Sequence, residues 1–175
     1  LKAAGGAGGR LAALGRGVVG GAGLALGATG AAAGPAPAPA ATAVPEEIEL
    51  VVVGAHLSGL PLNHELRNLG ARFLRAVDTE PCYTLYALPG GPPRRPGLIR
   101  VGDGQGAAIA TEVWALTPDA FGRFVSGIPA PLGIGTLRLA DGTRPKGFLC
   151  EPAAVRDAED VSEFGGWRAY IASLG

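Results

Sequence analysis

The chain has no methionine and only two histidines and two cysteines among its 175 residues. Because methionine is absent, position 1 is no translation start, and we expect the sequence to be a piece of a longer protein. Cys82 and Cys150 lie far apart without a C-x-x-C motif, which argues against a disulfide scaffold or structural zinc and suits a reducing cytoplasm. Two histidines without an acidic or cysteine cluster make a poor metal site. We therefore expect no metal and no other cofactor.

Residues 1–45 also lack acids, aromatic residues, serine, asparagine and glutamine. They contain Gly, Ala, Leu, Val, Pro and Thr with three basic residues, Lys2, Arg10 and Arg16. The apolar run at 17–34 is too rich in glycine for a membrane span or secretory signal. The Pro/Ala run at 34–40 favours an extended chain. We predict that residues 1–45 form a linker, poorly ordered or weakly helical, and that residues 46–175 form one domain.

A strong charge of either sign is absent from residues 46–175. The whole chain has 15 basic and 15 acidic residues, and three of the basic ones lie before position 46. The domain is therefore only slightly acidic, which predicts neither a nucleic-acid nor a membrane partner. A small anionic substrate would have to be held by local groups.

Short β-prone segments dominate the pattern of residues 46–175. Strands are expected at 48–53, 71–77, 83–88, 97–101, 107–116, 136–139 and 146–150. Glycine-rich turns suggest that most neighbours form hairpins, including 97–101 with 107–116. Helices are expected at 64–69 with Asn63 as cap, after the cap Thr117, and around 164–171. The pattern predicts an α+β fold with a curled sheet.

The strand at 48–53 runs into a loop of small residues that carries His56. Such a loop exposes backbone N–H groups, and an imidazole titrates near neutral pH, so the loop predicts an anion site with a proton carrier. The alternative is a histidine that only hydrogen-bonds a neighbouring loop, which the residues alone favour. His64 is expected on a helix surface.

Other polar residues offer further candidates. Glu112 lies in an apolar strand and shares a face with Ala110 and Trp114, so it either points to solvent or is a functional inward carboxylate. Residues alone do not choose among the basic candidates for binding an anion, which are Arg72, Arg75, Arg95, Lys146 and Arg168.

Several segments occur in the order found in one known family. They are 54–57 (GAHL), 60–63 (LPLN), 83–86 (YTLY), 111–114 (TEVW), 131–135 (PLGIG) and 160–170 (DVSEFGGWRAY). Over residues 47–173 the chain resembles the C-terminal domain of allophanate hydrolase, a branch of the γ-glutamylcyclotransferase-like fold. The resemblance implies a small, mixed, largely antiparallel β-barrel with flanking helices.

The resemblance also implies a function in urea degradation. An amidase domain of the same polypeptide would form N-carboxycarbamate, and this domain would convert it towards ammonia and CO2, with His56 as general acid. A cytoplasmic homodimer of the full-length protein is expected. The alternative is a noncatalytic module that oligomerises or positions the amidase domain. The predicted substrate-binding residues are Gly54, Ala55, Leu57, Ser58, Gly59, Asn63, Tyr83, Arg75 and Lys146.

One departure from the cyclotransferase relatives limits the chemistry. Those enzymes carry a catalytic glutamate after the helix that follows the E-V-W type strand, whereas residues 124–131 here (FVSGIPAP) contain no carboxylate. Cyclisation needs a base to deprotonate the attacking amine. The resemblance therefore predicts the fold without γ-glutamyl cyclotransfer.

Overall fold

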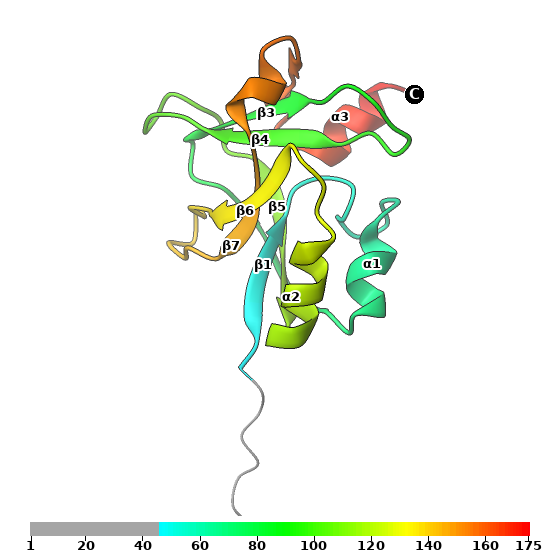
Figure 1. The fold of residues 1–175 in the computed structure, drawn as a ribbon. Helices are drawn as coiled ribbons and strands as arrows, with labels where there is room; N and C mark the ends of the chain where they lie inside the picture. The colour runs from blue at the N-terminus through cyan, green and yellow to red at the C-terminus, as the bar shows by residue number, and fades with distance from the viewer. Residues whose placement is uncertain (1–45) are drawn as a thin grey trace, which may run out of the picture. The chain divides into compact units, whose positions relative to one another are not determined.

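The computed structural model describes residues 46–175 (Figure 1), so the predicted linker lies outside the described residues. The strands are β1 (Ile48–Val52), β2 (Arg72–Asp78), β3 (Tyr83–Ala87), β4 (Pro96–Arg100), β5 (Ala110–Leu116), β6 (Leu132–Thr136), β7 (Lys146–Cys150) and β8 (Glu159–Asp160). The helices are α1 (Asn63–Asn68), α2 (Pro118–Ser126) and α3 (Trp167–Ser173), with short 3-10 turns η1 (Pro152–Val155) and η2 (Ser162–Phe164).

A five-stranded sheet with the order β2-β5-β1-β7-β6 forms the centre of the domain. All of its pairs are antiparallel except β1 with β7. The apolar run of β1 is fully buried at Leu50, Val51 and Val52, as expected for a strand that is covered on both faces. The first strand of the domain is therefore part of its core.

A smaller sheet with the order β4-β3-β8 lies across one end of the first (Figure 1). The α+β class and the mixed, mainly antiparallel pairing are confirmed. Within residues 46–175 the strands pair as two sheets instead of closing into a single barrel. The predicted hairpin of 97–101 with 107–116 is wrong, because β4 pairs with β3 whereas β5 pairs with β1 and β2.

Helices α1 and α2 begin differently from one another. Thr117 caps α2 as predicted, since its side chain accepts a hydrogen bond from the Ala120 N–H. Asn63, the predicted cap of α1, is instead the first residue of that helix, and its side-chain amide donates to the His56 carbonyl oxygen over 2.9 Å. The polar side chain therefore holds the loop between β1 and α1, residues 53–62, instead of capping the helix. This segment is called the opening loop.

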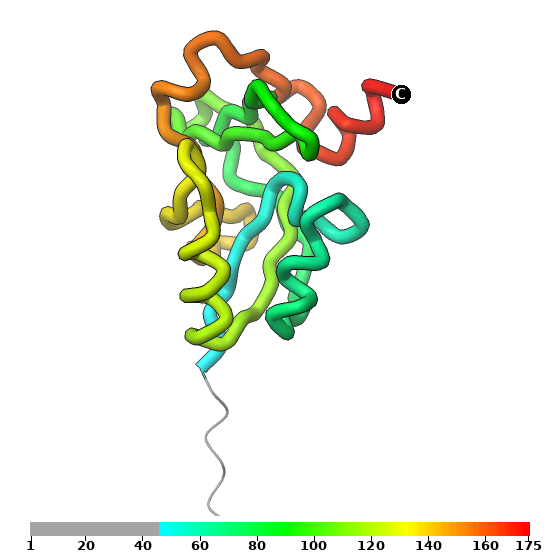
Figure 2. The backbone as a smooth tube through the Cα atoms, turned by 45° about the vertical axis from the view of Figure 1, so that its right-hand side comes forward, coloured from blue at the N-terminus to red at the C-terminus, as the bar shows by residue number. Residues whose placement is uncertain are grey.

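Helices α1 and α2 flank the buried strand that leads to the loop. In Figure 2 the trace of β1 passes between the two helices. The carboxyl end of β1 therefore leads residues 53–56 to the cavity wall that residues of both helices also form. None of the helices in residues 46–175 is long and apolar enough to cross a bilayer.

Candidate active site

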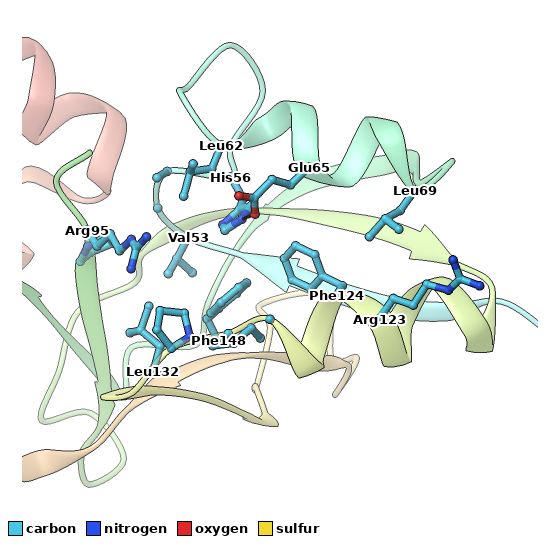
Figure 3. A pocket seen from close by; sticks show the side chains of 16 residues that line it. Val53, His56, Leu62, Glu65, Leu69, Arg95, Arg123, Phe124, Leu132 and Phe148 are labelled. Carbon is cyan, nitrogen blue, oxygen red and sulfur yellow. Dashed lines mark hydrogen bonds and ion pairs between the residues drawn. The ribbon is translucent and has the colours of Figure 1, made fainter. Parts of the chain in front are cut away.

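A cavity of about 390 Å³ lies at the end of β1, between α1 and α2 (Figure 3). Its walls are mainly apolar, and four charged or titratable side chains interrupt them: His56, Glu65, Arg95 and Arg123. A mostly apolar hollow with a few polar groups is the usual form of a small-molecule site. Its other lining residues are Val53, Gly54, Ala55, Leu62, Leu69, Pro96, Phe124, Gly127, Ile128, Pro129, Leu132 and Phe148.

The His56 imidazole is fixed on three sides. It stacks on Phe148 with ring centroids 5.4 Å apart and meets the edge of Phe124 at 5.1 Å. Its Nε2 atom lies 2.8 Å from Oε2 of Glu65, which comes from the first turn of α1 (Figure 3). With Nε2 facing a carboxylate, Nδ1 is the ring atom left for a ligand, since no bond to it occurs in residues 46–175.

Burial lowers the pKa of His56 below the usual value of 6.5, because the charged ring loses hydration. The hydrogen bond and the negative charge of Glu65 act in the opposite direction, and the nearby cation of Arg95 lowers the pKa further. The ring is therefore mainly neutral at neutral pH until something else brings negative charge into the cavity.

Two arginines give the cavity its positive charge, and Figure 3 shows His56 between them. Arg123 forms an exposed ion pair with Asp119 at 3.0 Å. Arg95 has no ion pair or side-chain hydrogen bond within residues 46–175. Arg95 is therefore the guanidinium in the cavity that is available for an anion.

The loop supplies fewer backbone donors than its sequence suggested. The Leu57 N–H donates to the Gly54 carbonyl oxygen at 2.9 Å, and the Ser58 N–H donates to Glu112 at 2.9 Å. Of the predicted binding residues in this loop, Gly54 and Ala55 line the cavity beside His56, whereas Leu57 and Ser58 do not, and Gly59 lies on a separate surface hollow. The structure therefore does not present the Leu57 and Ser58 N–H groups to the cavity, because internal partners already use them.

The remaining predicted binding residues lie outside the cavity. Asn63 holds the His56 carbonyl oxygen, and the buried Tyr83 hydroxyl accepts from the Arg138 N–H at 2.8 Å. Arg75 pairs with Glu49 and Asp141, and Lys146 donates to Thr136. The structure thus does not bring Tyr83, Arg75 or Lys146 together with His56.

Sequence reasoning missed the partner of His56. Glu65 follows the histidine by nine residues, and only the course of the loop brings the two together. Phe124 comes from α2 and Phe148 from β7, so sequence proximity gives no signal for either ring. His64 is exposed, as expected, and within the described part of the chain its ring bonds only to the Pro61 carbonyl oxygen.

Part of the cavity wall comes from the end of α2 and the segment that follows it. Phe124, Gly127, Ile128 and Pro129 line it without a carboxylate, as the sequence indicated. The carboxylate that is present, Glu65, enters from the opposite helix and is bound to His56.

Residues 48–172 match a known family in sequence. The family model of the allophanate hydrolase C-terminal domain matches residues 48–172. Urea amidolyase of Saccharomyces cerevisiae is 43% identical over 130 residues, which are 73% of this chain and 7% of that protein. The chain therefore spans only a small part of the curated relatives that it matches.

Solved structures agree with the sequence comparison. Allophanate hydrolase of Kluyveromyces lactis superposes with a TM-score of 0.71 at 41% identity, covering 74% of this chain and 22% of that one. The E. coli protein c4763 gives 0.66 at 33% identity and covers 73% of this chain and 97% of that one. The fold is thus that of an α+β domain found both within longer enzymes and alone. The chain belongs to the allophanate hydrolase C-terminal domain family.

Proposed function

We propose that this domain breaks a carbon–nitrogen bond of N-carboxycarbamate, the dianion with two carboxylates on one nitrogen. The observation that carries the proposal is the His56–Glu65 pair in a cavity that also holds the available guanidinium of Arg95. One carboxylate leaves as CO2, the electron pair of the broken bond stays on nitrogen, and one proton is added there to give the carbamate monoanion. Carbamate then takes a second proton and yields ammonia and CO2.

Three of the four charged or titratable groups in the cavity have a part in this reaction. Arg95 binds the carboxylate that is retained, since a guanidinium matches carboxylate geometry. The arriving dianion raises the pKa of His56, because negative charge favours the imidazolium that burial opposes. Glu65 holds Nε2 and stabilises that imidazolium, so that Nδ1 delivers the proton to the nitrogen.

The apolar walls favour the same step. Loss of CO2 together with protonation converts a dianion into a neutral gas and a monoanion, and this change is favoured where water is excluded. Phe124 and Phe148 pack on the imidazole and limit its motion. We expect an amidase domain of the same polypeptide to supply the substrate, and a full-length homodimer in the cytoplasm to be the working form.

The proposal is tested by generating the substrate in place. An allophanate-cleaving amidase is given ¹³C-labelled allophanate with and without this domain, and ¹³C NMR follows N-carboxycarbamate, carbamate and bicarbonate. We expect the domain to speed the decay of N-carboxycarbamate and His56→Ala to abolish that gain. Equal decay with and without the domain contradicts the proposal and supports a noncatalytic module, which would instead change the amidase's own rate or its oligomeric state.

A further inference from the structure

A second carboxylate lies next to the opening loop but outside the cavity. Glu112 of β5 is 8% exposed and accepts four hydrogen bonds. Its Oε2 receives the Ser58 N–H at 2.9 Å, the Ser58 hydroxyl at 2.8 Å and the Trp114 indole N–H at 3.1 Å. Its Oε1 receives Nη2 of Arg168 at 3.2 Å. A carboxylate with both oxygens so engaged is poorly placed to act as a base.

Ser58 is held at three of its atoms. Besides the two bonds to Glu112, its carbonyl oxygen accepts from Nη1 of Arg168 at 2.9 Å. One guanidinium therefore bridges the carboxylate and the loop backbone. Ser58 follows His56 by two residues, and the Asn63 amide fixes the His56 carbonyl oxygen from the other side.

The arginine comes from the last helix of the domain. The start of α3 is anchored on β5, where the Ala110 N–H donates to the Gly165 carbonyl oxygen at 2.8 Å and Trp167 is buried. The helix is thus seated independently of the loop, and Arg168 projects from it to Ser58 and Glu112. Arg168 and Glu112 therefore connect α3 to the loop that carries the His56 imidazole.

We propose that Glu112 and Arg168 are positioning residues that set the placement of His56, which makes the C-terminal helix α3 part of the active site. The proposal rests on the proposed function for its kinetic consequence but not for its geometry. The His56 backbone lies in a short loop that Asn63 holds at the His56 carbonyl oxygen and that Glu112 and Arg168 hold at Ser58. An imidazole displaced by about 1 Å would lose much of its reactivity. The clamp at Ser58 prevents that displacement.

The kinetic test compares arginines of similar exposure. Arg168 is 54% exposed, and Arg144, which pairs with Glu80 at the β6–β7 connection, is 52% exposed. We expect Arg168→Ala and Glu112→Gln to lower kcat about tenfold or more with KM changed less than about twofold, and Arg168→Lys to recover part of the loss. Arg144→Ala should keep the wild-type rate. Equal kcat in Arg168→Ala and Arg144→Ala overturns the proposal.

The second test needs no substrate. The chain has two histidines, so the ¹H–¹⁵N imidazole signals of His56 and the exposed His64 are assigned by His64→Ala. The charged groups that act on His56 are Glu65 and His64 from α1 and Arg95 from the segment before β4. We expect Arg168→Ala to shift the His56 signals and its titration midpoint and to leave His64 unchanged, although none of those groups is altered.

The two proposals fail in different ways. If His56→Ala leaves the decay of N-carboxycarbamate unchanged while Arg168→Ala moves the His56 signals, the proposed reaction is wrong and the positioning role stands. If Arg168→Ala leaves the His56 signals and titration unchanged, the positioning role is wrong, whatever the reaction. Thermal unfolding of every variant shows that folded protein is compared.

Discussion

The opening loop has a carboxylate on each side, and the two differ in almost every physical respect. The Glu65 side chain is 47% exposed, lies in the cavity wall and bonds only to His56 within residues 46–175. Glu112 is buried, lies outside the cavity and satisfies four donors. A carboxylate with spare acceptor capacity near a ligand can take part in proton transfer, whereas a saturated one gives order to its neighbours. The loop thus contacts one carboxylate, Glu65, that is placed to act on the His56 imidazole and another, Glu112, that holds the loop in position.

The largest expected effect comes from removing the His56 imidazole in the cavity. His56→Ala should slow decomposition of N-carboxycarbamate by about 10²–10⁴, the usual contribution of a general acid. His56→Asn should be nearly as damaging, because an amide hydrogen-bonds but does not deliver a proton at neutral pH. Time courses followed by ¹³C NMR measure the rate. His64→Ala is the control, and a wild-type rate in a folded His56→Ala variant would refute the catalytic role.

Removing the Glu112 carboxylate should lower the stability of the domain as well as its rate of catalysis. Glu112→Ala leaves the Ser58 and Trp114 N–H groups without their partner, and each buried unpaired donor costs about 1–3 kcal/mol. We expect the free energy of unfolding in urea to fall by about 2–4 kcal/mol. Glu163→Ala, on the short turn before α3, should stay within about 0.5 kcal/mol of wild type. A similarly small change for Glu112→Ala would show that water replaces the carboxylate.

The pH dependence of the rate tests the pairing of Glu65 with His56. The proposed reaction requires the imidazolium, so kcat/KM should fall as pH rises through the pKa of His56 in the free enzyme, which lies below 6.5. Glu65→Gln removes a group that raises this pKa, so the fall should begin at a lower pH. Glu163→Ala should leave the profile in place. A profile that moves to higher pH in Glu65→Gln would contradict the assigned pairing.

The last prediction is that the domain has no γ-glutamyl cyclotransferase activity. γ-Glutamyl peptides should not be cyclised, because residues 124–131 provide no base and Glu65 is bound to His56. Chromatography for 5-oxoproline measures the product, with the uncatalysed peptide as control. Product above that background that disappears in Glu65→Gln would show that the cavity carboxylate replaces the missing one.

Sequence reasoning succeeded where local chemistry decides the outcome. The buried strand at 48–52, the Thr117 cap and the histidine in the loop after the first strand all follow from a few adjacent residues. It failed where the pairing of a strand depends on a segment that is not adjacent in the sequence. The segment 97–101 was assigned to the wrong neighbour because β3 competes for it, and this competition is invisible in a local turn pattern.

The same reason explains the site. Glu65, Phe124 and Phe148 reach His56 from α1, α2 and β7, and only the assembled sheet places those three elements around one loop. Glu112 was identified as either solvated or inward, and burial settles that it is inward. Its bonds to Ser58 and Arg168 required the position of α3, which a seven-residue segment does not encode by itself.

The placement of β1 has a consequence for how the domain is made. This strand is the first of the domain to leave the ribosome, yet its two neighbours are β5 and β7, which are synthesised about sixty and about a hundred residues later. Pairings so distant in sequence slow folding, because a long loop must close before any contact rewards it. Until β7 arrives, one edge of an apolar strand has no partner. A nascent chain that stalls before Cys150 would therefore expose a segment prone to aggregation.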